Sequence, residues 1–415
     1  MVINLDMLYG SKAACQQQRY KEACGRFAAL YGGRPDIFVS APGRSELGGN
    51  HTDHQHGIVL TAAVDLDTIA AVCRQSDPVI EICSEGYAPF LVDLERLLPV
   101  ADEAGNSAAI VRGVAAAFSS RGYNTGGFKA YVTSDVLPGS GLSSSASFEV
   151  LIGAIMSHLY NGGSVPAAEI AKIGQFAENE FFGKPCGLQD QMACALGGVS
   201  YIDFKDTTAP VYESIDFGLS AHGFALCITN TGGSHDNLTG EYAAIPGEMG
   251  TIAQNFGQRW LRFCDEQEVV SRLPELRAAC GDRAVLRALH FFRENRRPQE
   301  MAAALRKGDF AEFLRVVNES GRSSFEYLQN VSVSATPESQ PVGIGLALSE
   351  RLLEGRGAWR VHGGGFAGTI QAYVPTDMVE TYRNAMEAVF GSGCCYVLSF
   401  RSSGLTAVEG VILNG

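Results

Sequence analysis

The sequence is short of positive charge, of paired cysteines and of long apolar runs. Its 415 residues carry 32 Lys and Arg against 45 Asp and Glu, which gives a formal net charge of −13. Such an acidic chain lacks a basic surface for a phosphate backbone, so we do not expect nucleic-acid binding. None of the 11 cysteines forms a CxxC pair, and no segment approaches the roughly 18 apolar residues that cross a bilayer. Because residues 1–12 also lack a basic segment followed by an apolar run, we expect a cytoplasmic protein with reduced thiols and no membrane partner.

The length and the apolar content predict two domains. A chain of 415 residues exceeds what one hydrophobic core usually fills, and 46% hydrophobic residues can supply two cores. We expect an N-terminal domain over 1–215 and a C-terminal domain over 216–415. Segments rich in β-branched and aromatic residues predict strands at 37–40, 58–64, 68–73, 79–83, 128–132, 199–204, 224–230, 359–362, 369–374 and 396–400. Apolar periodicity and end signals predict helices at 145–160 and 166–182, within 247–319 and between 376 and 391, which makes the predicted fold class α+β.

The segment 137–147, LPGSGLSSSAS, follows a predicted strand and opens the predicted helix at 145–160. Glycines let a ligand approach the backbone closely, and successive N–H groups at a helix N-terminus bind anions. A phosphate therefore suits this segment, and the serine hydroxyls can reach a Mg²⁺ ion that bridges phosphate oxygens. The alternative is an ordinary serine cap on a core helix. Three consecutive serines directly after two glycines favour the phosphate loop.

The segment 41–57, APGRSELGGNHTDHQHG, concentrates polar residues between two predicted strands. Polar groups this dense at a strand end are costly unless a ligand or solvent satisfies them. A metal site that uses His51, Asp53 and His54 is one interpretation, although adjacent donors on a loop rarely converge on one ion. A polyhydroxylated ligand held by Asp and His hydrogen bonds suits the residue types better.

Two further segments carry weaker signals. VHGGGFAGT at 361–369 places four glycines between two predicted strands, and a bulged hairpin turn explains it equally well. AENEFFGKPCGLQDQ at 177–191 breaks one helix and starts another, so helix capping is the alternative role for Asp190.

Taken together, these four segments resemble the motifs of the GHMP small-molecule kinases, and within them those of the galactokinases. That group carries APGRxNLIGEHTDYxxGxVLP, PxGxGLSSSAS, AExxFxGxPCGxxDQ and a late GGGFGG loop, which appear here in the same order between residues 41 and 368. The resemblance implies a two-domain GHMP kinase fold with the active site between the domains. It implies an ATP-dependent sugar 1-kinase that makes galactose 1-phosphate and ADP.

The resemblance also implies roles for individual residues. Asp190 matches the aspartate that takes the proton of the anomeric hydroxyl, and Arg44 matches the arginine that pairs with it and stabilises charge. Ser145 and Glu178 match the pair that binds Mg²⁺. The ATP phosphates would be held by Gly139, Ser140, Gly141, Leu142, Ser143, Ser144 and Ser145. The sugar would be bound by Glu46, Asn50, His51, Thr52, Asp53 and Tyr242.

The sequence departs from the galactokinase pattern on the sugar side. Where the pattern has NLIGEHTDY, this chain has ELGGNHTDH at 46–54, so the glutamate that contacts the C6 hydroxyl in that group is Asn50 here. An amide donates as well as accepts, so a C6-modified hexose such as galacturonate is an alternative substrate, whereas Glu46 restores a carboxylate four positions earlier. A non-catalytic sugar sensor is the alternative from another class, and intact Arg44, Ser145, Glu178 and Asp190 disfavour it. A nicotinamide-dependent oxidoreductase is disfavoured because no βαβ pattern surrounds the glycine loop.

Overall fold

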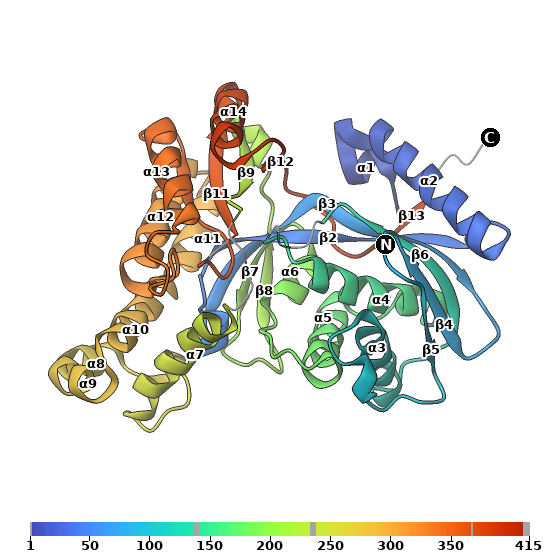
Figure 1. Ribbon diagram of the computed structural model, residues 1–415, viewed down its shortest axis with the longest axis horizontal. Coiled ribbons are helices and arrows are strands. Elements are labelled where there is room, and N and C mark those ends of the chain that lie inside the picture. Colours follow the sequence, from blue (N-terminus) through green and yellow to red (C-terminus); the bar gives the residue numbers. More distant parts are fainter. Residues whose placement is uncertain (1, 137–138, 140, 233–237, 367, 410–415) are drawn as a thin grey trace.

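The computed structural model describes residues 2–136, 139, 141–232, 238–366 and 368–409. In this part of the chain the strands form two sheets, and helices cover the faces of both (Figure 1). The nine-stranded sheet contains β1 (Val2–Asn4), β2 (Ile37–Gly48), β3 (Ile58–Arg74), β4 (Val79–Ser84), β5 (Phe90–Asp93), β6 (Phe128–Ser134), β7 (Val199–Asp203), β8 (Val211–Ile215) and β13 (Thr406–Glu409). The four-stranded sheet contains β9 (Phe224–Asn230), β10 (Ala358–Val361), β11 (Thr369–Pro375) and β12 (Cys395–Leu398).

The helices fall into two groups along the chain. The first group is α1 (Leu5–Tyr9), α2 (Ala13–Tyr31), α3 (Ser107–Ser120), α4 (Ser144–Tyr160), α5 (Ala167–Ala177) and α6 (Gln189–Leu196). The second group is α7 (Thr239–Gln254), α8 (Glu266–Ser271), α9 (Leu273–Cys280), α10 (Asp282–Glu294), α11 (Arg297–Lys307), α12 (Phe310–Ser323), α13 (Pro341–Leu353) and α14 (Val379–Phe390). Two π-helical turns, Glu178–Phe182 and Ser324–Leu328, continue α5 and α12. No helix in the described ranges is long and apolar enough to cross a bilayer.

The long strand β3 corrects the sequence-based expectation of two separate strands at 58–64 and 68–73. Its 17 residues pair with β2 along one edge, while β7 and β6 share the other edge in turn. At Asp65 and Asp67 the register with β2 shifts between Pro42 and Arg44, and the Asp65 N–H donates to the Ser399 carbonyl, but the strand continues through both residues. The hydrophobic pattern therefore predicted two strands where the backbone forms one.

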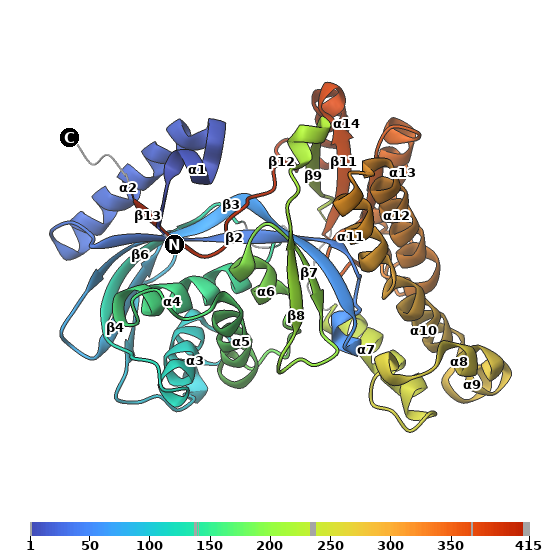
Figure 2. The same cartoon turned by 180° about the vertical axis from the view of Figure 1, so that it is seen from behind.

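Alternating side chains of the large sheet build two cores, one on each face. Phe38, Ile69 and Ala71 point toward α2, which contributes Tyr20 and Phe27. Their neighbours Val39, Ala70 and Val72 point the other way, into a core built with α3, α4, α5 and α6. Figures 1 and 2 show α1 and α2 on one side of the sheet and α3 to α6 on the other.

A further core joins the two sheets. Leu60 of the large sheet, Met301 of α11, Phe313 of α12 and Tyr373 of β11 belong to one buried cluster. The small sheet packs its other face against α13 and α14. This continuous packing fixes the loops of both sheets relative to one another.

The chain end returns to the first sheet. β13 lies between β1 and β2, parallel to the former and antiparallel to the latter. The last described strand thus completes a sheet formed chiefly by the N-terminal half. The predicted domain division between residues 215 and 216 stays a prediction.

Candidate active site

The segments 41–57 and 177–191 meet through an ion pair between Arg44 and Asp190. Arg44 lies on β2 between two register shifts, and Asp190 lies in the first turn of α6. Arg44 Nε lies 2.7 Å from Asp190 Oδ1, and Arg44 Nη2 lies 2.6 Å from Oδ2. Burial by itself would raise the pKa of Asp190, but the charge of Arg44 together with the hydrogen bonds from Arg44 and Ser143 outweighs it and holds that pKa below the usual aspartate value. Asp190 is therefore ionised at neutral pH, and its side chain is still 35% exposed.

The phosphate-loop candidate touches the same ion pair. The Ser143 hydroxyl donates to Asp190 Oδ2, and Arg44 Nη1 donates to the carbonyl of Gly141. The Arg44 backbone N–H also donates to the Leu142 carbonyl at 3.0 Å. Ser143 adopts a left-handed conformation with φ of 63°, directly before α4 begins at Ser144. Ser140, predicted to bind ATP, lies outside the described residues.

A cavity of about 360 Å³ lies between the phosphate-loop candidate and the third glycine segment. A Cβ atom on Gly141 would stand 2.4 Å from Thr369 Oγ1, which explains why glycine is required at this point of closest approach. The cavity thus unites three segments that the sequence leaves far apart. Its walls are formed by Arg44, Gly139, Gly141, Ser143, Ser144, Ser145, His362, Gly363, Gly364, Gly365 and Thr369.

The predicted metal ligand Glu178 is buried at the start of a π-helical turn, a type of helix irregularity common at functional sites. Its Oε2 accepts a hydrogen bond from Gln191 Nε2 at 3.0 Å, and the same nitrogen donates to Glu149 Oε2 at 2.9 Å. Glu149 Oε1 is buried with no partner among the described atoms. Burial first, and the nearby Glu178 carboxylate second, raise the pKa of Glu149 well above its usual value.

This donor set suits Mg²⁺, which prefers hard oxygen ligands and little direct protein coordination. Glu178 has a buried carboxylate and Ser145 has a hydroxyl on the cavity wall, so the residue types fit the ion, and their joint binding of Mg²⁺ stays a prediction. In the described ranges no three His, Cys, Asp or Glu residues are placed to hold a metal ion. The alternative metal site at His51, Asp53 and His54 is therefore not formed in the structure.

The predicted sugar loop is anchored to α10 by hydrogen bonds from its backbone to Glu294. Glu294 Oε1 accepts the backbone N–H groups of Gly49 at 2.9 Å and Asn50 at 3.2 Å. Burial would raise the pKa of Glu294, but Arg297, whose Nη1 lies 2.6 Å from Glu294 Oε2, acts together with His290, Arg360 and the Ser320 hydrogen bond to lower that pKa to about 2. A permanently ionised carboxylate thus anchors the loop. Within it, Thr52 Oγ1 donates to the carbonyls of Gly49 or Ile58, which is a structural role.

The remaining predicted sugar residues surround the third glycine segment and the loop before α6. His51 Nε2 lies 3.0 Å from the Gly364 carbonyl, and the Tyr242 hydroxyl donates to the Gly365 carbonyl at 2.9 Å. Burial first, and His54 second, lower the pKa of His51 to about 4, so His51 is neutral at pH 7. Asp53 Oδ2 lies where a Cβ on residue 187 would be only 2.1 Å away, so Gly187 lets the carboxylate come close.

Glu46 and Asn50 are buried and contact each other. Asn50 Nδ2 donates to Glu46 Oε1 at 3.0 Å, and both side chains are buried. Arg360 of β10 donates to the same Glu46 oxygen at 2.7 Å. Arg360, Gln191 and Glu149 were not among the predicted site residues. Gln191 ends the quoted segment 177–191 and Glu149 lies in the predicted helix 145–160, whereas no residue pattern near Arg360 distinguishes it from a surface arginine.

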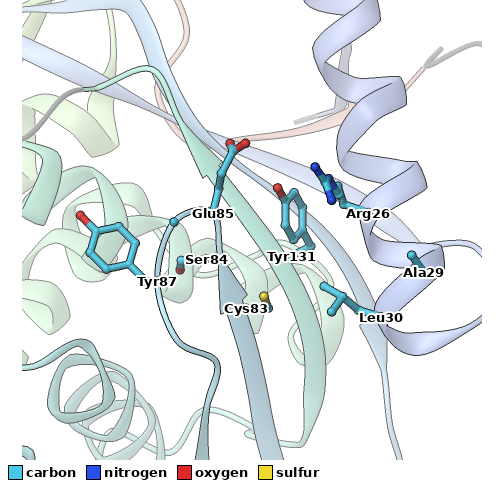
Figure 3. A pocket seen from close by; sticks show the side chains of 9 residues that line it. Arg26, Ala29, Leu30, Cys83, Ser84, Glu85, Tyr87 and Tyr131 are labelled. Atoms are coloured by element: carbon cyan, nitrogen blue, oxygen red, sulfur yellow. The ribbon is translucent and has the colours of Figure 1, made fainter.

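A second cavity, of about 410 Å³, lies between α2 and the strands β4 and β6 (Figure 3). Figure 3 shows Arg26 and Leu30 on the helix facing Tyr131, with Tyr87 on the adjoining turn. None of the predicted site residues lines this cavity. Predicted site residues line the cavity at Arg44 instead.

Two family models match segments that carry the predicted site residues. The model of the GHMP kinases N terminal domain matches residues 104–198, which include the phosphate-loop candidate and Asp190. The galactokinase galactose-binding signature matches residues 25–74, which include Arg44 and the segment up to Asp53.

Solved structures share the fold across nearly the whole chain. The galactokinase of Lactococcus lactis, solved with galactose, aligns with a TM-score of 0.79 at 23% identity over 94% of this chain and 99% of its own. The mevalonate kinase of Methanococcus jannaschii has a TM-score of 0.62 at 13% identity, over 88% of this chain and 98% of its own. The phosphomevalonate kinase of Streptococcus pneumoniae, solved with phosphomevalonate and AMPPNP, has a TM-score of 0.59 at 12% identity, over 88% and 99%. The predicted α+β kinase fold is confirmed.

Proposed function

We propose that this chain, which belongs to the GHMP kinases, transfers the γ-phosphoryl group of ATP to the anomeric hydroxyl of galactose. The products are galactose 1-phosphate and ADP. The observation that carries the proposal is the ionised Asp190, paired with Arg44 and still exposed beside the glycine-lined cavity. The galactose-binding signature over 25–74 supplies the substrate class.

Asp190 acts as the proton acceptor in this proposal. Its carboxylate takes the proton of the sugar hydroxyl while the sugar oxygen bonds to the γ-phosphorus and the bond to the ADP oxygen breaks. Arg44 holds both carboxylate oxygens and so fixes the direction of Asp190. Phosphoryl transfer depends chiefly on positioning and charge stabilisation, so an ionised, oriented aspartate suffices without a covalent intermediate.

The ATP phosphates lie, in this proposal, against the N-terminus of α4 and residues Gly139 to Ser145. Free N–H groups at a helix N-terminus, together with the helix dipole, favour the phosphate charge. Ser145 and Glu178 would hold Mg²⁺, which supplies charge neutralisation of the phosphates when bound. Gln191 keeps Glu178 in place through its amide.

The same proposal divides the chain into units of residues 1–215 and 216–415 with the ligands between them, and it assigns the enzyme to the cytoplasm. The cavity supports the division, because Ser143 to Ser145 come from the first unit and His362 to Thr369 from the second. β13 is the exception, since it adds to the sheet of the first unit.

The test is release of ADP from MgATP with and without galactose, with the sugar phosphate identified by mass spectrometry. We expect ADP release to depend on galactose and a product phosphorylated at C1. Calorimetric binding of galactose is measured in parallel. Binding of galactose without ADP release would replace the kinase proposal by the sugar-sensor alternative.

A further inference from the structure

Asn50 is closed to any ligand in this structure, although it sits in the sugar loop. Its side-chain nitrogen donates to Glu46 Oε1 at 3.0 Å and to the Gly363 carbonyl at 2.8 Å. Its side-chain oxygen accepts from Ser324 Oγ at 3.1 Å and from Asn330 Nδ2 at 3.0 Å. A carboxamide has two N–H donors and two lone pairs, so all four positions are filled. With 1% of its surface exposed, Asn50 joins the sugar loop to the third glycine segment and to Ser324 and Asn330.

Glu46 is also buried, and protein donors occupy three of its acceptor positions. Its Oε1 accepts from Arg360 Nη2 at 2.7 Å as well as from Asn50, and its Oε2 accepts from Gln189 Nε2 at 3.1 Å. The Arg360 side chain is completely buried, so the ion pair is not screened by solvent. The negative charge of Glu46 is thereby neutralised inside the protein.

The two residues also exchange places relative to the motif that they resemble. The galactokinase pattern has Asn at the first position and Glu at the second, whereas this chain has Glu46 and Asn50. The structure shows that these two side chains touch. The exchange therefore preserves one amide and one carboxylate in contact, while it moves the carboxylate from position 50 to position 46, beside Arg360.

We infer that Glu46 and Asn50 form a reversed carboxylate and amide pair that determines specificity, by withdrawing the carboxylate from the C6 end of the sugar. The inference rests on the proposed function. Galacto-configured sugars are then accepted with little regard to the C6 group, and the substrate class includes the uronic acid and the 6-deoxy sugar as well as galactose.

The contacts explain why position 50 cannot change alone. An Asn50→Glu substitution would place a carboxylate against Glu46 Oε1 and the Gly363 carbonyl, which only accept hydrogen bonds. Like charges at this distance repel, and two buried acceptors would lose their donor. A Glu46→Asn change made at the same time supplies an amide donor to the new carboxylate.

The expected specificity follows from what a buried acceptor costs. A site that uses a carboxylate to bind a hydroxyl rejects a ligand without that hydroxyl strongly, because the carboxylate is left unpaired. Here neither position 46 nor position 50 has an unpaired carboxylate that could accept a hydrogen bond from the C6 hydroxyl. We expect kcat/KM for galactose, 6-deoxygalactose and galacturonate to agree within about tenfold, since loss of one weak contact costs no more.

The experiment compares wild type, Glu46→Asn, Asn50→Glu and the double variant on these three sugars. Asn50→Glu should lower both the melting temperature and kcat/KM, and the double variant should recover much of each. The double variant should also prefer galactose over the other two sugars by about 10²-fold or more, because a carboxylate now stands at position 50. Glu213→Asn removes a surface carboxylate paired with Arg306 and serves as the matched control, with unchanged sugar ratios.

Two results would overturn the inference. One is a wild-type enzyme that prefers galactose over galacturonate and 6-deoxygalactose by 10²-fold or more, by the same criterion. The other is a double variant with the wild-type sugar ratios. Calorimetric binding of the three sugars gives the same comparison without turnover. If no sugar is phosphorylated, the proposed kinase function fails, whereas the binding ratios and the melting temperatures of the four proteins still decide for or against the reversed pair.

Discussion

Arg44 and Asp190, separated by 146 positions in the sequence, form two parallel hydrogen bonds at the edge of the glycine-lined cavity. The planar guanidinium matches the carboxylate, so the pair fixes orientation as well as charge. An Asp190→Asn variant keeps the size of the side chain but cannot accept the proton. We expect turnover to fall by about 10²–10⁴-fold, the usual contribution of a positioned general base, with galactose binding largely retained.

ADP release and calorimetric sugar binding measure the two effects on the same preparation. Asp135→Asn, on an exposed carboxylate beside Arg19, is the control for the loss of one acidic side chain. Unchanged turnover in the Asp190 variant would remove that residue from the mechanism.

An Arg44→Lys variant tests the geometry of the pair rather than its charge. A lysine ammonium cannot reproduce the fork that contacts both Asp190 oxygens and the Gly141 carbonyl. We therefore expect a fall in kcat of at least about 10-fold with KM for galactose changed much less. If kcat stayed at the wild-type value, Arg44 would contribute only its positive charge, and its bidentate contact would have no role in turnover.

We expect the Gln191 amide to affect both the stability of the fold and the Mg²⁺ dependence of activity. Gln191→Met keeps the approximate volume but removes the donor shared by Glu149 and Glu178, so two buried carboxylates lose their common partner. We expect the free energy of unfolding to fall by about 1–3 kcal/mol, and the Mg²⁺ concentration for half-maximal activity to change.

Thermal unfolding with and without Mg²⁺ and ADP separates these effects. Gln175→Met, on the neighbouring helix α5, removes a single bond to the Cys186 carbonyl and is the matched control. Equal unfolding curves for the two variants in all conditions would contradict the prediction.

Local residue patterns located the elements that carry the site. The run of serines after two glycines correctly marks the start of α4, which begins at Ser144, one residue before the predicted start at 145. Strands such as β9 and β11 lie where β-branched residues are concentrated. These features were predictable because each depends on neighbours within one turn or one strand.

The partners of the buried charges were not predictable from pattern. Arg360 reaches Glu46 across 314 positions, and a lone arginine in a strand carries no signal of such a contact. The π-helical turn at Glu178 packs against α3, which is distant in the sequence, and the turn looks like ordinary helix in sequence. The closure of Asn50 likewise arises from Ser324 and Asn330, which belong to none of the motifs.

We expect the protein to lose stability in mild acid because His51 is buried in its neutral form. Its pKa is lowered to about 4 in the folded protein, from a usual value near 6.5, chiefly by burial. The unfolded chain therefore binds the proton more readily, so this contribution is complete above pH 6.5 and is lost as the pH falls from 6.5 through 4. The lowered pKa values of buried His290 and His362 act in the same direction.

The total for His51 is about 3 kcal/mol, at 1.36 kcal/mol for each pKa unit. Urea unfolding at intervals between pH 7.5 and 4 should show a shallower pH dependence for His51→Asn than for wild type. Asparagine tolerates the positive φ of this position. His222→Asn, at an exposed histidine, should keep the wild-type slope, and an equal slope in the His51 variant would exclude His51 as the source.

The last prediction concerns the chain end that returns to the first sheet. Arg401 precedes β13 and donates from Nη1 to Asp67 Oδ2 and to Ser40 Oγ, both at 2.8 Å. Asp67 is fully buried and also pairs with Arg19 of α2 at 2.6 Å. Burial would raise the pKa of Asp67, but Arg19 and Arg401 outweigh it and lower that pKa. The ion-pair cluster therefore connects both ends of the chain to the central strands.

Arg401→Met removes one cation from a buried carboxylate, and we expect the free energy of unfolding to fall by about 3 kcal/mol at pH 7. The exposed pair of Arg315 and Glu312 offers the contrast, since Arg315→Met should cost less than about 1 kcal/mol. Adding Asp67→Asn to Arg401→Met should cost less than the sum of the two single changes, because the lost partner is shared. Urea unfolding measures the wild type and all four variants. Additive losses would show that Arg401 acts independently of Asp67, and β13 would then be held by its strand pairing with β1 and β2 alone.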